Sequence, residues 1–112
     1  MRATYLALFL LAAFSAMAVA MAGGHGSEAT SGQAVFEANC ASCHSGGFGG
    51  FFTGAPKVGK KADWEPLIAK GVDTLTANTI AGIGKMAARG ECASCTDADI
   101  RAAVSYMVES SQ

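Results

Sequence analysis

The apolar and polar positions divide the 112-residue chain into an apolar N-terminal segment and a mixed remainder. Residues 5–14 form an apolar run after the basic Arg2, and small residues follow, with Ala-x-Ala patterns that end at Ala18, Ala20 and Ala22. This order is typical of a secretory signal peptide. We therefore expect residues 1–22 to be cleaved after export. The alternative is a membrane anchor, for which the run is short against the roughly 20 residues of a spanning helix.

The clearest helical period lies at the other end of the chain. Apolar residues recur at spacings of three and four in one stripe, namely Ile100, Ala103, Val104, Met107 and Val108. The stripe predicts a helix from Thr96 or Asp97 to about Glu109 that packs one face on another helix. Thr96 and Asp99 have the spacing of a capping box at its start.

A second helix is expected before residue 40. Thr30 and Gln33 resemble a capping box, and Ser31 is a rival cap. Phe36 would be a core residue of this helix. The preceding residues 23–31 are small and polar, and we expect a flexible tail in which His25 is solvated.

Two short helices are expected in the middle of the chain. One runs over residues 64–70, with Asp63 as its cap and Gly71 at its end, and the other runs from Asp73 or Thr74 to Ala81. No strand-like alternation is present. The pattern therefore predicts one all-α domain over residues 32–112, and the roughly 90 residues left after cleavage suffice for one small core.

The candidate chemistry is concentrated in Cys40-Ala41-Ser42-Cys43-His44. Two cysteines three residues apart, followed at once by histidine, favour covalent haem attachment. The thiols would form thioethers with the porphyrin, and His44 would lie under the iron. The alternatives are a redox dithiol, a disulfide, and a zinc site shared with Cys92 and Cys95. Export favours haem, because cysteines of exported proteins are usually oxidised or covalently used.

A haem bound by one histidine needs a second axial ligand or an open iron site. Met86 and Met107 are the methionines that remain after cleavage. Met107 lies on the apolar stripe, where methionine is usually a core residue. Met86 lies in a glycine-flanked loop that could cross the haem face, so we predict it as the ligand. The alternative is an ordinary apolar loop residue and a five-coordinate iron.

Three features between these motifs leave alternatives open. Residues 46–54 combine glycine with Phe48, Phe51 and Phe52, and we expect a loop that partly covers one haem edge; the alternative is an exposed docking patch. Pro56 suits a loop that passes the histidine side of the haem, because it has no amide donor. The Trp64 indole could donate to a haem propionate or to a backbone carbonyl.

These motifs together resemble the class I c-type cytochromes and, among them, the bacterial cytochrome c5 family. The resemblance covers residues 32–109 and rests on the haem motif, residues 54–59 (Gly-Ala-Pro-Lys-Val-Gly), Trp64, residues 68–71, the Met86 loop, the second Cys-x-x-Cys pair and residues 102–107. It implies an all-α class I cytochrome c fold, in which the N- and C-terminal helices pack around one covalently bound haem c.

The resemblance also implies several residue roles. His44 and Met86 would be the axial ligands, the Pro56 carbonyl would orient His44, and Cys92 and Cys95 would form a disulfide. The chain departs from the family in two places. Ala87 and Ala88 stand where proline commonly follows the methionine, which implies a looser loop, and the glycine- and phenylalanine-rich residues 46–52 are longer than usual.

The expected function is one-electron transfer by a periplasmic monohaem cytochrome with redox partners such as membrane-bound reductases or oxidases; a weak homodimer is a second candidate assembly. An open-site haem enzyme or gas sensor, or a zinc-binding structural module, would be the rivals. The net charge of −1 and the absence of a basic run argue against nucleic-acid binding. Five lysines in the haem-surrounding segment could attract acidic partners or only solvate the surface: Lys57, Lys60, Lys61, Lys70 and Lys85.

Overall fold

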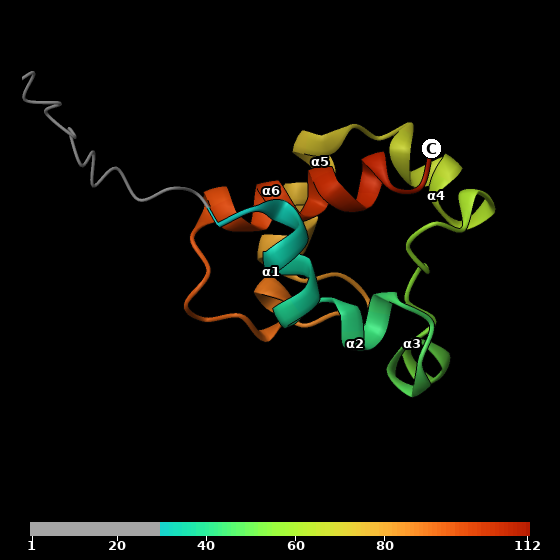
Figure 1. Cartoon of the computed structure of the whole chain (residues 1–112), viewed down its shortest axis with the longest axis horizontal. Helices are drawn as coiled ribbons and strands as arrows, with labels where there is room; N and C mark the ends of the chain where they lie inside the picture. Colours follow the sequence, from blue (N-terminus) through green and yellow to red (C-terminus); the bar gives the residue numbers. More distant parts are fainter. Residues whose placement is uncertain (1–29) are drawn as a thin grey trace, which may run out of the picture.

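The computed structural model describes residues 30–112, so the expected signal peptide, His25 and almost all of the expected tail lie outside the described residues. Within that range the chain forms six α-helices and one 3-10 helix (Figure 1): α1 (Gly32–Asn39), α2 (Ala41–His44), α3 (Phe48–Thr53), α4 (Lys61–Ile68), α5 (Val72–Ala81), η1 (Ala88–Glu91) and α6 (Asp97–Glu109). Residues 30–112 contain no β-strand, and their one bridge pairs Ile83 with Met86. This confirms the all-α prediction.

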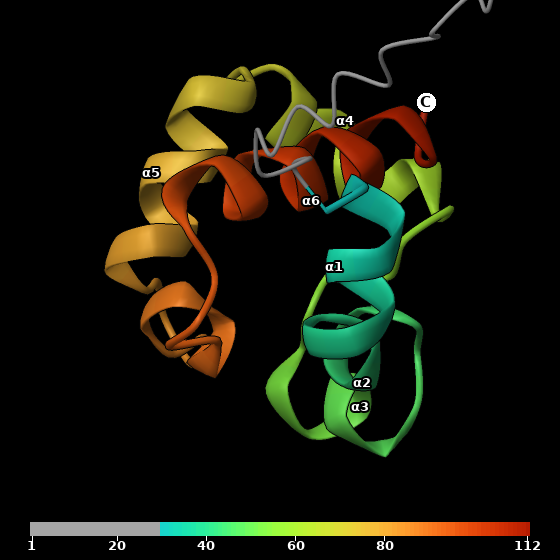
Figure 2. The same ribbon diagram turned by 60° about the vertical axis from the view of Figure 1, so that its left-hand side comes forward.

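Helix α1 crosses helix α6, so the two ends of the domain are packed together (Figure 2). Gly32 permits the close approach, because a Cβ atom at that position would overlap the carbonyl group of Ala102. Farther along the crossing, the rings of Phe36 and Tyr106 lie with their centroids 5.3 Å apart. The predicted packing of the first helix on the last is therefore confirmed.

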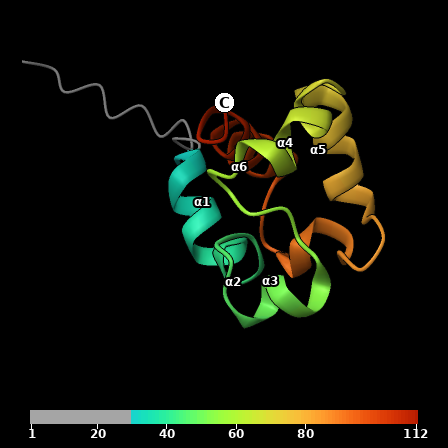
Figure 3. The same cartoon turned by 90° about the vertical axis from the view of Figure 1, so that its right-hand side faces the viewer.

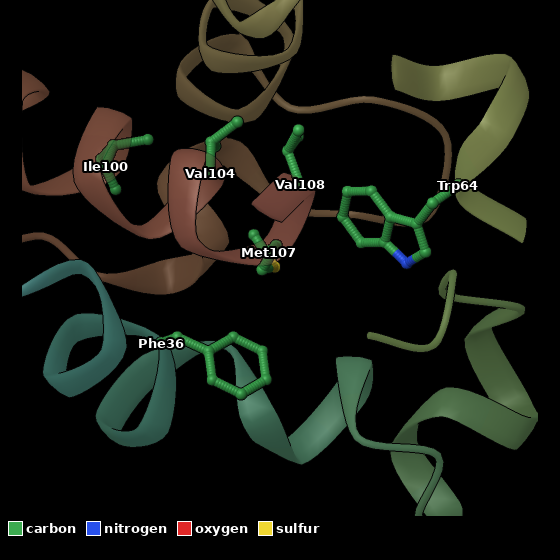
Figure 4. Packing of buried hydrophobic residues seen from close by; sticks show 6 residues of the cluster. All are labelled: Phe36, Trp64, Ile100, Val104, Met107 and Val108. Atoms are coloured by element: carbon green, nitrogen blue, oxygen red, sulfur yellow. The ribbon is translucent and has the colours of Figure 1, made fainter. Parts of the chain in front are cut away.

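The hydrophobic core lies between α1, α4 and α6 (Figure 4). All five residues of the predicted α6 stripe are buried, and Phe36 and Trp64 complete the core with exposed fractions of 7% and 3%. Met107 is 4% exposed, as expected for a core methionine. A helix of this length is stabilised mainly by burial of such a stripe, which is why the apolar period predicted it well.

The helix caps agree with the sequence at α6 and differ at α1. Thr96 and Asp99 form the predicted capping box, with each side chain accepting from the other residue's backbone N–H. At α1 the cap is Ser31, whose hydroxyl accepts from the Ala34 amide at 3.2 Å. The Thr30–Gln33 capping box is therefore wrong, and the Gln33 amide donates instead to Glu37 at 2.8 Å.

Two other expectations need correction. Helix α4 begins before Asp63, which lies in its first turn and accepts hydrogen bonds from the backbone of Lys57 and the side chain of Lys60. The expected loop at residues 46–54 contains helix α3, closed by a backbone bond of 3.1 Å from Phe51 to Gly47. Glycine lowers helix propensity but does not forbid a single turn when packing supports it. Among the described residues, no helix has the length and apolar character required to cross a membrane.

Candidate functional site

A cavity of about 390 Å³ lies between two parts of the chain that are far apart in sequence. Its lining residues come from residues 39–44 and 53–56 in one part and from residues 83–91 in the other. Figure 3 shows the backbone of both parts at the same end of the molecule. The volume falls within the range of about 300–1,000 Å³ that is usual for sites of small molecules and cofactors. The cavity brings together all of Cys40, Cys43, His44, Pro56 and Met86.

Helix α2 carries Cys43 and His44, and Cys40 precedes it as its N-cap, so both thiols and the histidine line this cavity. The backbone bond of 3.0 Å from the His44 amide to the Cys40 carbonyl forms the single turn that places these side chains together. Both cysteines are free and half-buried. Burial raises the pKa of the Cys40 thiol, and the neighbouring Cys43 raises that pKa further. Two free thiols that line the same cavity fit thioether attachment of a haem.

His44 is buried and fixed from two directions. Its Nδ1 atom lies 2.8 Å from the Pro56 carbonyl oxygen, and its own carbonyl accepts from the Val58 amide at 2.8 Å. Because a carbonyl oxygen can only accept, Nδ1 carries the proton of the neutral imidazole and Nε2 keeps its lone pair. The Pro56 contact is the one that the family resemblance implied, and it leaves the Nε2 lone pair free to bind a metal.

Trp64 supports the histidine from the side of the core. Its indole donates to the Lys57 carbonyl at 2.9 Å, so the backbone acceptor is the one that the structure contains. The Trp64 and His44 ring centroids lie 6.4 Å apart. Both residues line a second cavity of about 100 Å³, which adjoins the core. Contact of Trp64 with the cofactor therefore stays a prediction.

Met86 reaches the site from the loop after α5. Backbone bonds of 3.0 and 2.9 Å join Ile83 and Met86 in a tight reversal. Met86 lines both the larger and the smaller cavity, as His44 does, whereas Met107 lines only the smaller one. The Met86 thioether and the His44 imidazole therefore border the same cavities, as two ligands of one cofactor would.

Arg89 is a residue of this loop that the sequence pattern did not reveal. Its guanidinium donates to the Cys95 carbonyl at 2.6 Å and to the Asp97 carboxylate at 2.8 Å, so it ties the loop to the start of α6. Its backbone has a φ of 59°, and Glu91 has a φ of 64°. Such left-handed φ values are uncommon for residues other than glycine. No short sequence motif identifies an arginine that stabilises a loop in this conformation.

The second cysteine pair, Cys92 and Cys95, forms a disulfide in the structure. A disulfide removes both thiolates from metal binding, so the zinc site of four cysteines considered from the sequence is wrong. In agreement, residues 30–112 contain no group of three or more His, Cys, Asp or Glu side chains that could hold a metal ion. The bond closes the chain between the Met86 loop and α6.

The phenylalanines of α3 do not cover the site as expected. Phe48, Phe51 and Phe52 are 84%, 81% and 68% exposed, and none of them lines either cavity. The expected partial cover of the cofactor edge is therefore wrong. Instead, Thr53 and Gly54 at the end of α3 contribute to the cavity wall.

Comparison with known proteins identifies the relatives of the chain. The family model described as cytochrome c oxidase, cbb3-type, subunit III matches residues 27–107. The chain is 45% identical over 89 residues to cytochrome c-555 of Chlorobaculum tepidum, covering 76% of this chain and 79% of that protein. It is 38% identical over 84 residues to cytochrome c5 of Azotobacter vinelandii, covering 73% of this chain and 96% of that protein. The resemblance to the cytochrome c5 family is confirmed.

Solved structures agree with the family match. The mono-haem ferrocytochrome c of Shewanella putrefaciens is 38% identical with a TM-score of 0.61, covering 74% of this chain and 96% of that one. A chain of the electron transfer complex of nitrite reductase with cytochrome c is 37% identical with a TM-score of 0.66. The match covers 72% of this chain and 94% of that one. The predicted class I cytochrome c fold and the haem c cofactor are thereby confirmed.

Proposed function

The chain belongs to the c-type cytochromes, and we propose that it carries single electrons between redox proteins with His44 and Met86 as the axial ligands of its haem. The observation that carries the proposal is the sharing of two cavities by these side chains, which come from separate segments. Haem c, held through Cys40 and Cys43, supplies a one-electron iron couple when bound.

The chain's own residues favour electron transfer over catalysis. The Pro56 carbonyl holds the His44 ring at 2.8 Å and fixes the tautomer whose Nε2 can bind a metal. A methionine on the other side leaves no open position for a substrate and favours the reduced state, which raises the potential. The named relatives are small cytochromes, in keeping with a carrier rather than an enzyme.

We place the mature protein in the periplasm, with membrane-bound reductases or oxidases as its partners. The apolar N-terminal run with its Ala-x-Ala patterns supports export. Cysteines that form a disulfide in one pair and suit thioethers in the other also fit an oxidising compartment. Electron carriers of this kind meet partners through small, transient contacts.

A visible spectrum of the holoprotein, produced in a bacterial host that attaches haem to exported cytochromes, tests the proposal. We expect low-spin bands in the reduced protein and a weak sulfur-to-iron charge-transfer band in the oxidised protein. Met86→Ala should abolish the charge-transfer band and allow carbon monoxide to bind the reduced iron. Immediate binding of carbon monoxide by the wild type would overturn the proposal in favour of an open-site haem protein.

A further inference from the structure

Helix α3 carries an aromatic face that nothing in the described residues covers. The face consists of Phe48, Phe51 and Phe52, which are 84%, 81% and 68% exposed. Positions i, i+3 and i+4 share one side of a helix. Ring centroids lie 6.2 Å apart for Phe48 and Phe52 and 5.4 Å apart for Phe51 and Phe52, so the rings form one cluster. Contiguous exposed apolar patches commonly mark sites of interaction.

The opposite side of α3 explains why these rings point outward. A Cβ atom at Gly49 would lie 2.6 Å from the Ser42 carbonyl oxygen, and one at Gly50 would overlap the Cys43 carbonyl. Glycine at both positions therefore lets α3 lie directly against the haem-attachment helix α2. This arrangement is the reverse of an ordinary amphipathic helix, whose apolar side chains face the core.

The aromatic face borders the haem cavity without filling it. The residues that follow it, Thr53 and Gly54, line the cavity, and α2 and α3 lie together at one end of the molecule (Figure 3). The Lys85 amino group, which also lines the cavity, donates to the Phe52 carbonyl at 3.4 Å. A protein seated on the face would therefore be close to the cofactor.

The charges beside the aromatic face are positive. Lys57 lies against the turn before α3, because a Cβ atom at Gly46 would be 2.8 Å from its Cδ atom, and Lys85 lies at the end of α3. The chain has no Asp or Glu between Glu37 and Asp63. Glu91 is the one carboxylate among the cavity-lining residues.

We propose that the aromatic face is the docking surface for a redox protein that presents an apolar spot ringed by carboxylates. The proposal rests on the function proposed above and names the chemistry of the partner. An aromatic side chain can bury about 150–250 Å². The exposed parts of the three rings, together with the matching surface of the partner, would therefore bury about 1,200 Å² or less. That size is typical of transient electron-transfer contacts. A second copy of the chain would instead bring Lys57 and Lys85 against their own equivalents, and like charges repel.

The test uses the mature holoprotein and gold electrodes coated with alkanethiols. A mixed layer of methyl and carboxylate ends imitates the partner, and hydroxyl and amine layers serve as references. Adsorption is weighed with a quartz crystal microbalance while voltammetry records electron exchange. The variants are Phe48→Ser/Phe51→Ser/Phe52→Ser and the matched triple change to leucine. Lys57→Gln is compared with Lys61→Gln, a lysine at the start of α4.

We expect the serine variant to adsorb on the mixed layer about tenfold more weakly than the wild type, which corresponds to about 1.4 kcal/mol, and the leucine variant to adsorb nearly as well. The spectrum and melting temperature should stay unchanged, because the rings are exposed. Lys57→Gln should weaken adsorption at low salt more than Lys61→Gln does, and the difference should disappear as salt screens the charges.

Equal adsorption of the serine variant and the wild type would overturn the docking proposal. Phenylalanine-dependent binding to phosphatidylglycerol vesicles that exceeds adsorption on the mixed layer would also overturn it and assign the face to a membrane. A phenylalanine-dependent dimer in sedimentation would assign it to a second copy. Absence of a voltammetric wave on every layer, with adsorption intact, would instead refute the electron-carrier function.

Discussion

The two sides of the haem cavity are built in different ways. On the histidine side, residues 40–58 form a nearly continuous stretch in which His44 is held by the backbone of Cys40, Pro56 and Val58. On the methionine side, Met86 lies in a loop that is held by a long side chain, Arg89, and by a disulfide. The histidine is therefore fixed by near neighbours in sequence, and the methionine by contacts with the start of α6.

This difference predicts that the position of His44 tolerates substitutions nearby better than the position of Met86 does. Two backbone hydrogen bonds hold the main chain of His44, and burial and the Pro56 carbonyl hold its imidazole, so the position of the ring should survive most single changes. The thioether has no proline after it, and the backbone there includes two non-glycine residues with positive φ, Arg89 and Glu91. Residues in such conformations cost of order 1–3 kcal/mol each and persist only where their surroundings stabilise them. The proposed bond between Met86 and the iron should therefore break before the bond to His44.

The largest expected effect comes from removing an attachment point on the histidine side. Cys43→Ala should leave little mature holoprotein, because one of the two thioethers cannot form and the exported apoprotein lacks the cofactor that fills its cavity. Haem-stained denaturing electrophoresis of the exported fraction measures the loss. Ser42→Ala, in the same helix, is the control and should retain the stain. Full staining of the Cys43 variant would contradict attachment through this residue.

The next prediction separates the two methionines. Met107→Ala should lower the free energy of unfolding by about 2–5 kcal/mol, as for other buried methionines, and should leave the sulfur-to-iron band in place. Met86→Ala should abolish the band, lower the potential and cost less stability, since Met86 is only half-buried in the described chain. Denaturant titrations and redox potentiometry of both variants measure these effects. Loss of the band in the Met107 variant alone would reverse the assignment.

A smaller effect is expected at the support of the methionine loop. Arg89→Ala removes a charged hydrogen bond to the Cys95 carbonyl, for which about 1.5–3 kcal/mol is typical; the exposed pair with Asp97 should add little. An alkaline titration should then show loss of the sulfur-to-iron band about 1–2 pH units lower than in the wild type.

Two comparison variants sharpen this test. Cys92→Ser/Cys95→Ser opens a loop of about four residues, for which chain entropy gives roughly 2 kcal/mol, so its midpoint should also fall. Arg101→Ala, which removes the exposed ion pair between Arg101 of α6 and Asp73 of α5, is the matched control and should leave the midpoint in place. If Arg89→Ala behaves like the control, the loop is held by the disulfide and the backbone, and the contribution of Arg89 is negligible.

The smallest effect is expected on the histidine side at Asp63. Hydrogen bonds from the Lys60 side chain and then the Lys57 backbone hold the pKa of this carboxyl below its usual value of 3.8. A lowered pKa contributes stability above the unfolded value and loses it as pH falls through the folded value. Asp63→Asn should therefore lower the melting temperature slightly at pH 7 and not at pH 2, as measured by calorimetry. A difference that grows on acidification would contradict the sign.

Much of the fold and the centre of the site could be predicted from the sequence because they depend on short separations along the chain. The α6 stripe and its capping box repeat at three and four residues, and every one of those predicted positions is buried or capped in the structure. Cys40, Cys43 and His44 fall within five residues, so a single turn places them on one cavity. Local backbone geometry leaves these side chains few alternatives.

Tertiary structure decided what depends on distant partners. The acceptor of the Trp64 indole is the Lys57 carbonyl, which only the packed loop supplies. The carbonyls of α2 meet the glycines of α3, and this contact turns three phenylalanines toward solvent against the hydrophobic expectation. Arg89 acquires its role from the Cys95 carbonyl and Asp97 at the start of α6. Hydrophobic period and short motifs specify which face of an element is buried, whereas the partner of a side chain depends on how the elements meet.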